Sequence, residues 1–234
     1  MQQELQQLRW HHFQRVDDLC ATIVAALTML ANESISARGA FHISLAGGRT
    51  PKIIYERLRD IQTDWTRWFI YFGDERCLPR GDAERNDTLA FSSWLAHVPI
   101  PAAQTFSIPA ELGAERGAIE YSKQLNALSE FDLVLLGLGE DGHTASLFPG
   151  LFPSDSIDAN SVAIAVQTAP KLPAQRISLS ASRLSAARAV WFVVTGVDKK
   201  TALLRWREGE EIPAAHIVPA AGIDIFTDVD LTGR

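Results

Sequence analysis

The chain has 234 residues, of which 47% are hydrophobic, so it carries enough apolar material to bury a sizeable core. We expect a single α/β domain over residues 1–234. A net charge of -6 and a pI near 5.5 argue against nucleic acid or an anionic membrane as the main partner. An anionic ligand must therefore meet a local cluster of cations.

The cysteines and the N-terminus predict a cytoplasmic protein. Cys20 and Cys77 stand in different contexts without metal-ligand spacing, which is typical of a reducing compartment. The N-terminus lacks the basic start and apolar core of a signal peptide, and we expect no apolar run long enough to span a bilayer.

The first predicted elements are a helix and a strand. Apolar residues at helical spacing predict a long amphipathic helix over residues 5–31, on which His11 and His12 are expected to be solvated. A short apolar run then predicts a strand over residues 41–46.

This strand runs directly into Gly47-Gly48-Arg49-Thr50-Pro51. Thr50 is a good N-cap and Pro51 suits a first turn, so a helix is expected to begin here. A glycine turn that opens a helix presents free backbone N–H groups to an anion such as phosphate, and Arg49 adds a positive charge. The motif is short and lacks the P-loop lysine, so an ordinary turn is the alternative.

The arrangement repeats at residues 68–73, an aromatic strand that ends in Asp74-Glu75-Arg76. Arg76 is suited to holding an oxyanion through two hydrogen bonds, and Asp74 to orienting Arg76 or a ring hydroxyl. A surface charge cluster is the alternative. The following residues predict, in order, an irregular loop over 77–85, a helix over 86–94, a weak strand over 105–108 and a helix over 113–128.

Residues 132–138 form a nearly unbroken apolar run, typical of a strand buried on both faces of a parallel sheet. Three glycines then bracket Glu140, Asp141 and His143. A loop at the carboxyl end of a buried strand is where open α/β sheets bind ligands. His143 is therefore the leading candidate for a catalytic group, and a structural or surface histidine is the alternative.

Three more strands are expected, over residues 161–166, 176–180 and 189–194, and the last leads through Gly196-Val197-Asp198-Lys199-Lys200 into a helix. The piece from Ile212 onward has no assignment. Strands alternating with helices predict a Rossmann-like fold: a doubly wound, mostly parallel sheet with helices on both faces. In that topology the loops after the strands share one edge, which gathers Arg49, Thr50, Arg76, His143 and Lys199.

Such a site favours acid/base chemistry on a sugar phosphate. Cations and helix-terminal amides suit a phosphorylated small molecule, and a histidine beside carboxylates suits proton transfer near neutral pH. The chain has no serine in a Gly-x-Ser-x-Gly elbow and no His, Asp or Glu cluster with metal spacing. We therefore expect no metal site.

Several of these segments together resemble the 6-phosphogluconolactonase family, in the right order over residues 40–205. They are Ala46 to Pro51, Gly73 to Arg76 with Pro79 and Asn86, Gly137 to Gly150, Arg176 to Leu179, and Thr195 to Lys199. The segment from Asp141 to Gly150 is the specific one, and the others support it.

The resemblance implies the fold of the deaminase/lactonase superfamily and hydrolysis of 6-phosphoglucono-1,5-lactone to 6-phosphogluconate without a metal or cofactor. It also implies that His143 activates water, with Asp74 and Asp141 as polar partners. The phosphate would be held by Gly47, Gly48, Thr50, Arg76 and Lys199, with help from Arg176.

The chain departs from the family pattern at two positions. Arg49 stands where the family usually has Ser, which leaves its role at the phosphate open. Arg85 stands before Asn86 where members often carry Ser. The small-molecule lactone is the expected partner, and the chain is expected to be a monomer or a small homo-oligomer.

Three other readings remain. A glucosamine-6-phosphate deaminase would carry a carboxylate where this chain has Phe148. A dinucleotide-dependent dehydrogenase would use the Gly-x-Gly-x-x-Gly of residues 137–142, but Glu140 and Asp141 would repel a pyrophosphate. A non-enzymatic sugar-phosphate sensor would need the cations but not His143.

Overall fold

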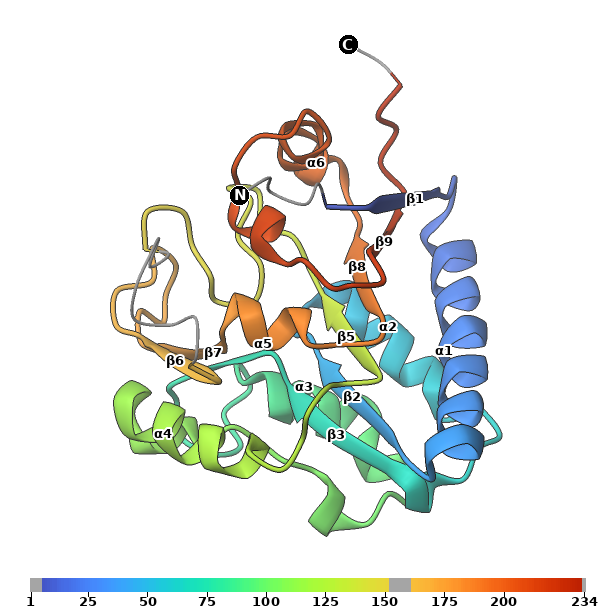
Figure 1. Cartoon of the computed structure of the whole chain (residues 1–234), viewed down its shortest axis with the longest axis vertical. Coiled ribbons are helices and arrows are strands. Elements are labelled where there is room, and N and C mark those ends of the chain that lie inside the picture. Colours follow the sequence, from blue (N-terminus) through green and yellow to red (C-terminus); the bar gives the residue numbers. More distant parts are fainter. Residues whose placement is uncertain (1–5, 152–160, 233–234) are drawn as a thin grey trace.

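The computed structural model describes residues 6–151 and 161–232, and its centre is a six-stranded sheet (Figure 1). In spatial order the strands are β1 (Leu8–His12), β9 (Ile223–Thr227), β8 (Val190–Val194), β5 (Leu133–Leu136), β2 (Phe41–Leu45) and β3 (Trp68–Phe72). Every neighbouring pair is parallel. All residues of β5 and β8 are buried, as apolar strands covered on both faces should be. The expected mostly parallel α/β sheet is confirmed.

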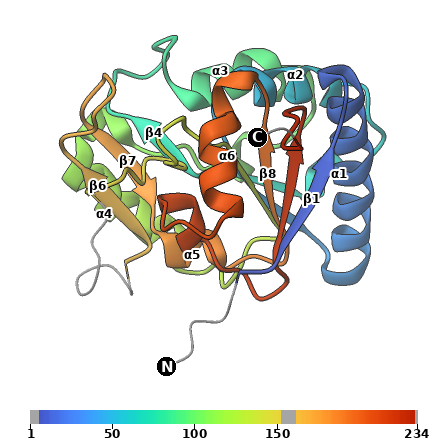
Figure 2. The same cartoon turned by 90° about the horizontal axis from the view of Figure 1, so that it is seen from above.

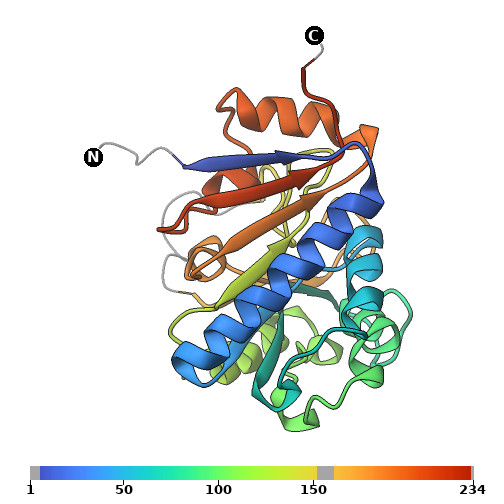
Figure 3. The ribbon, with the colours of Figure 1, turned by 90° about the vertical axis from the view of Figure 1, so that its right-hand side faces the viewer.

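Helices cover both faces of the sheet (Figure 2). α1 (Val16–Arg38) and α2 (Arg49–Leu58) lie on one face, and α6 (Lys200–Arg207) lies over the other. Figure 3 shows α1 running diagonally across the strands. The remaining helical elements are α3 (Asn86–Ser93), α4 (Ala114–Leu125), α5 (Ala181–Ser185) and 3-10 turns at Trp65–Arg67, Leu95–His97, Ala102–Gln104, Ala110–Leu112, Val197–Lys199 and Pro213–His216.

A second, smaller sheet stands beside the first. It is antiparallel, in the order β4 (Asp74–Arg76), β7 (Arg176–Leu179) and β6 (Ala163–Val166), and α4 packs on β6 and β7. The sequence predicted β6 and β7 but not β4, whose three residues are all polar and carry no apolar pattern. Pairing with β7 gives this stretch its strand geometry, and in register it places Arg76 opposite Arg176 and Asp74 opposite Ser178.

The direction of the connections changes between the two central strands β2 and β5. From β2 the chain moves outward to β3, whereas from β5 it moves the opposite way to β8 and then β9. In open α/β sheets such a divergence leaves a crevice beyond the carboxyl ends of the two strands. The loops that follow Leu45 and Leu136 therefore open onto the same crevice.

The structure corrects the predicted first helix. Residues 8–12 are strand β1, which pairs with β9, and the helix begins only at Val16. His11 is thus on a strand, where its ring stacks on Phe226 at 4.7 Å and its Nε2 lies 2.8 Å from Asp224. Leu8 and Trp10 are two residues apart and so lie on one face of a strand, and pairing with β9 gives these residues their strand geometry.

Two smaller corrections concern strands. Residues 105–108 form no strand, and Thr105 makes only an isolated bridge to Ile70 of β3. The unassigned C-terminal piece contains β9, which lies between β1 and β8. Local sequence gave no signal for it because Pro219 and Gly222 stand immediately before a run of only five residues.

The length and apolar character of α1 also correct an expectation. By length and composition alone, with a mean hydropathy of 1.5, it is the one helix among the described residues that could cross a membrane. In the structure its apolar stripe packs against the sheet: Leu19, Ile23 and Leu27 are fully buried in the core that helix and sheet share.

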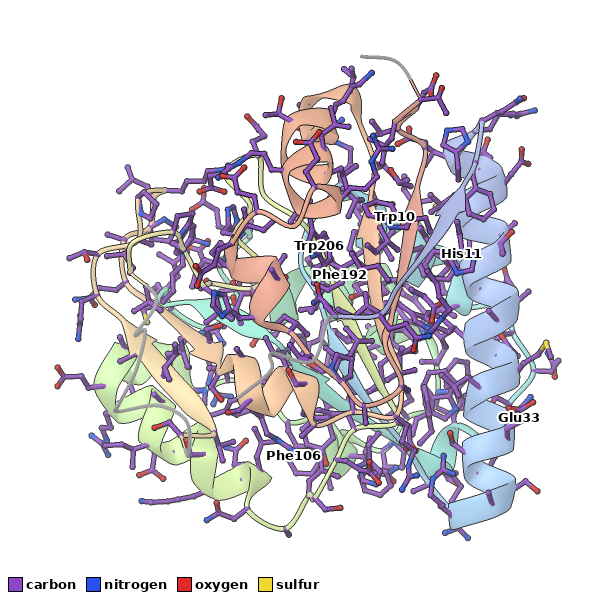
Figure 4. The ribbon with its side chains drawn as sticks, turned by 45° about the horizontal axis from the view of Figure 1, so that its top comes forward. Trp10, His11, Glu33, Phe106, Phe192 and Trp206 are labelled. Atoms are coloured by element: carbon purple, nitrogen blue, oxygen red, sulfur yellow. The ribbon has the colours of Figure 1, made fainter. Side chains whose placement is uncertain are left out.

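Aromatic packing fixes α6 against the sheet. Trp10 of β1, Phe192 of β8 and Trp206 of α6 lie together (Figure 4). The rings of Phe192 and Trp206 meet edge to face at 4.6 Å between centroids, and those of Trp10 and Trp206 at 6.3 Å. Such pairs add about 0.5–1.5 kcal/mol beyond the area that they bury. The cluster therefore steadies the turn between β8 and α6, which carries Lys199.

Candidate active site

A cavity of about 370 Å³ opens at the carboxyl ends of β2 and β5, where the topology places a crevice. Segments that are far apart in the sequence line it: the turn after β2, strand β4, the glycine loop after β5, the segment before β7 and the turn after β8. Of the residues singled out from the sequence, seven line this cavity: Gly47, Gly48, Asp74, Arg76, His143, Arg176 and Lys199.

Arg49 and Thr50 face a neighbouring cavity of about 560 Å³ instead. The two cavities share Gly47, Gly48 and Lys199 on their walls, so they are continuous around the turn after β2. The Thr50 hydroxyl is within hydrogen-bonding distance of the Thr195 hydroxyl after β8. Arg49 and Thr50 thus lie at the edge of the first cavity rather than in its wall.

The helix after this turn begins two residues earlier than predicted. Gly48, with φ 115° and not Thr50, is the N-cap, and α2 starts at Arg49. An L-residue rarely adopts that backbone conformation, whereas glycine does so without steric cost. Gly47 has a different reason to lack a side chain, because a Cβ there would stand 1.9 Å from Oδ1 of Asn86.

Asn86 and Ser146 fix the orientation of Asp74. The Asn86 side-chain amide donates to the Asp74 main-chain oxygen at 2.8 Å and to its Oδ1 at 3.0 Å. The Ser146 hydroxyl donates to the other carboxylate oxygen at 2.5 Å. Asp74 is buried and held from both sides, so its carboxylate is pre-oriented at the cavity wall. Sequence reasoning did not assign a site role to Asn86 or Ser146.

His143 is paired with Asp141 through a short hydrogen bond at Nδ1, and its ring packs on Phe148 at 4.6 Å. Only 17% of the imidazole is exposed. Burial lowers the pKa of His143, and this effect outweighs Asp141, which raises it. Burial alone would raise the pKa of Asp141, but the hydrogen bond and charge of His143 bring that pKa below its usual value. The favoured state near neutral pH is therefore a neutral imidazole beside a carboxylate.

The loop that carries the pair is shaped by its glycines. A Cβ on Gly139 would stand 1.9 Å from Nδ1 of His143, so only glycine allows the ring to come this close. Gly142 has φ 88° and Ala145 has φ 47°, and the Thr144 hydroxyl donates to the Gly137 carbonyl at 2.9 Å. Residues 137–151 form turns and no helix, which removes the dinucleotide-binding reading of this motif.

Lys199 and Arg76, two of the predicted cations, already contact other residues of the protein. The Lys199 ammonium lies 3.1 Å from Asp198 and 3.7 Å from Glu140, one of the two carboxylates that flank the glycine loop. Arg76 donates from Nη1 to the Glu84 main-chain oxygen, while its buried Nε has no partner among the described residues. An unpartnered buried donor at a cavity wall is a natural contact for an anionic ligand.

Arg176 lines the cavity, and several of its donors are also used within the protein. Its Nε donates to the Pro173 carbonyl at 3.1 Å, and its Nη2 to the carbonyls of Lys171 and Leu172 at 3.1 and 3.3 Å. The guanidinium also lies over the Phe148 ring at 5.5 Å. These contacts hold the segment before β7 against the cavity.

That segment brings in a cation that sequence reasoning missed. Lys171 lines the cavity with His143, although it precedes a strand of the small sheet and follows none of the parallel strands. The only signal for it was a lysine between two prolines, in Pro170-Lys171-Leu172-Pro173.

Arg85, the second departure from the family pattern, belongs to a buried ion cluster. It donates to both carboxylate oxygens of Asp87 at 2.8 and 2.7 Å and lies 3.3 Å from Glu111. Beside it, Glu75 accepts the main-chain N–H groups of Asn86 and Asp87, and burial raises the pKa of Glu75 to about 7. The cluster fixes the first turn of α3, and with it Asn86.

The described residues contain no group of three or more His, Cys, Asp or Glu side chains arranged to hold a metal ion. What the arrangement offers is a neutral, carboxylate-paired imidazole in one cavity with several cations.

The family of glucosamine-6-phosphate isomerases and 6-phosphogluconolactonase matches this chain over residues 14–226. The chain belongs to that family. A human 6-phosphogluconolactonase is 35% identical over 200 residues, covering 80% of this chain and 77% of the human protein. A probable chloroplastic 6-phosphogluconolactonase from Oryza sativa subsp. indica is 34% identical over 208 residues, or 82% of this chain, but the match spans only 63% of the rice protein's length.

The fold agrees with that of solved family structures. The 6-phosphogluconolactonase from Trypanosoma brucei superposes with a TM-score of 0.82 at 25% identity, covering 95% of this chain and 97% of that one. The six-stranded sheet and its surrounding helices are therefore the deaminase/lactonase fold that the sequence predicted.

Proposed function

We propose that this chain is a 6-phosphogluconolactonase, which hydrolyses 6-phospho-D-glucono-1,5-lactone to 6-phosphogluconate in the oxidative pentose phosphate pathway. The observation that carries the proposal is one cavity lined by His143, paired with Asp141, and by the cations Arg76 and Lys199. Lactone hydrolysis needs a base beside the carbonyl carbon and an anchor for a phosphate at the other end of the sugar, and relatives carry the same name.

In the proposed reaction His143 is the general base. Asp141 accepts a hydrogen bond from Nδ1–H, which leaves the Nε2 lone pair free to take a proton from water. The water oxygen bonds to the lactone carbonyl carbon, and the carbonyl oxygen becomes an oxyanion. The tetrahedral intermediate then collapses, the bond from that carbon to the ring oxygen breaks, and Nε2 returns its proton to the ring oxygen. The new carboxylic acid ionises in water.

The phosphate is assigned to the other end of the cavity. The first turn of α2 offers main-chain N–H groups after Gly47 and Gly48, and Lys199 stands between this turn and the main cavity. Arg76 adds a guanidinium with a free buried donor. Arg49, at the start of α2, supplies charge from the edge, in place of the hydroxyl that the family usually has there.

The deaminase branch of the family is disfavoured by Phe148. This side chain is buried, packs on the His143 ring and supports Arg176, so an apolar ring stands where a deaminase needs a carboxylate for acid/base work.

The cytoplasmic location expected from the sequence stays a prediction, because the rice relative is named as chloroplastic. The oligomeric state also stays a prediction.

Stopped-flow hydrolysis of freshly generated lactone, corrected for spontaneous opening, tests the proposal. We expect His143→Ala to lower kcat by about two to four orders of magnitude while product affinity is largely kept. Arg76→Ala should mainly raise KM, because its cation binds substrate and intermediate alike.

The matched control is His97→Ala, an exposed histidine in the 3-10 turn after α3, which should retain parental rates. A parental rate no faster than buffer would refute the lactonase proposal. Sugar-phosphate binding that survives in His143→Ala, beside absent turnover in the parent, would favour a sensor.

A further inference from the structure

The cations of the cavity do not stand in equivalent places. Lys199 lies between the cavity and the first turn of α2, and it is shared with the neighbouring cavity. Lys171 lines the main cavity only, together with His143 and Leu172. Because the phosphate and the reacting carbonyl are at opposite ends of the substrate, cations at different ends of the cavity must act on different groups.

Lys171 also differs in its partners. Lys199 is engaged by Asp198 and Glu140, which reduces its field toward a ligand. Lys171 forms no ion pair with any described residue, and its main-chain oxygen is fixed by Arg176. Within residues 6–151 and 161–232 its ammonium therefore has no carboxylate partner, and its backbone is tied to the cavity wall.

The field of Lys171 reaches the imidazole. The charged groups that act on His143 are Asp141 of its own loop and Asp74 of β4, which raise its pKa, and Lys171 of the segment before β7, which lowers it. Arg205 of α6 interacts electrostatically with Asp141. Lys171 thus lines the same cavity as His143, and its positive charge acts to lower the pKa of the imidazole.

We propose that Lys171 is a catalytic residue that stabilises the oxyanion formed when water attacks the lactone carbonyl. The inference rests on the proposed lactonase function and assigns a role within the same cavity. An ammonium group placed where negative charge develops is worth more in the transition state than in the ground state, so it raises kcat and not merely affinity. Lys199 and the α2 turn, by contrast, hold the phosphate throughout the reaction.

The test compares Lys171→Met with Lys199→Met in the full chain, using kcat, KM and the pH dependence of kcat/KM. For Lys171→Met we expect kcat to fall about 10²-fold with KM changed less than about threefold. Loss of a positive charge near His143 raises the imidazole pKa, so the acidic limb of the profile should move to higher pH. Lys199→Met should instead raise KM with little change of that limb.

Two further variants keep the outcome decisive. Lys171→Arg retains the charge and should recover most of kcat and the parental limb. Lys123→Met, an exposed lysine on α4 paired with Glu120, should behave like the parent. An unchanged kcat and an unmoved limb in Lys171→Met, with the parent active, would overturn the role of Lys171 and leave the lactonase function intact. A parent without turnover would overturn both.

Discussion

The surroundings of His143 shift the pKa of its imidazole in opposite directions. Burial and the charge of Lys171 lower the pKa of the imidazole, while Asp141 and Asp74 raise it. The net direction is downward, which keeps the ring neutral and able to accept a proton near neutral pH. A base with a lowered pKa suits a reaction in which the same nitrogen must later return its proton.

Asp141→Asn separates the two contributions of Asp141. An asparagine amide can donate to Nδ1 and favour the tautomer that carries its proton on Nε2, so kcat should fall by about two to three orders of magnitude. Because Asp141 raises the pKa of His143, its removal lowers that pKa and moves the acidic limb of kcat/KM to lower pH. This shift is opposite in sign to that of Lys171→Met. A pH–rate profile would check it, and a limb that moved upward would contradict this placement of the charges.

The sequence allowed site residues to be predicted where they follow a strand of the parallel sheet. Gly47, Arg76, His143 and Lys199 were found in this way, and all four line the cavity. Lys171 was missed because it precedes β7 of the antiparallel sheet, which the sequence did not separate from the main one. The hydrogen bonds from Arg176 to main-chain carbonyls were equally unpredictable, because a sequence does not show which acceptors a guanidinium group will contact.

The glycine loop after β5 is the element on which the site depends. Gly137 and Gly139 both have ordinary backbone angles, yet their surroundings differ. A Cβ on Gly139 would overlap the His143 ring, whereas a Cβ on Gly137 would meet no atom within 4 Å. Gly139 is therefore required by the approach of the imidazole and not by the turn itself.

We expect Gly139→Ala to lower kcat by about 10²-fold, because the ring must move by on the order of 1 Å and loses its alignment with the substrate. The clash is with side chains that can shift, so the free energy of unfolding should change by no more than about 1 kcal/mol. Gly137→Ala is the matched control and should leave the His143 ring in place. Steady-state kinetics and denaturant unfolding measure both effects, and equal losses of kcat in the two variants would argue against this account of Gly139.

The elements that sequence reasoning missed share one physical cause. β1, β4 and β9 have three to five residues each, and their strand geometry comes from partners that are distant in the sequence. β1 pairs with β9, which is more than 200 residues away, and β4 pairs with β7. Continuous apolar runs such as β5 and β8 can be recognised as strands from the sequence alone, whereas short polar or mixed strands take their geometry from the sheet that they join.

At the scale of the whole molecule, the parallel topology assembles the site. The chain leaves β2 and β5 in opposite directions, and the loops from these strands, from β3 and from β8 therefore meet over one crevice. This convergence was predictable, because it follows from strand–helix alternation and right-handed connections. The small sheet closes the crevice from the side: β4 contributes Asp74 and Arg76, and the segment before β7 contributes Lys171. This contribution became visible only in three dimensions.

The central claim is that the imidazole and the cations serve a single ligand. The most direct measurement is a titration of the parent protein with 6-phosphogluconate, followed through the ring resonances of His143, which His143→Ala assigns by their loss. We predict that product binding shifts these resonances saturably and raises the His143 pKa, because the product carboxylate lies beside the ring. Lys199→Ala should weaken that response and the binding together. Saturable binding that leaves the His143 resonances unmoved would contradict the account.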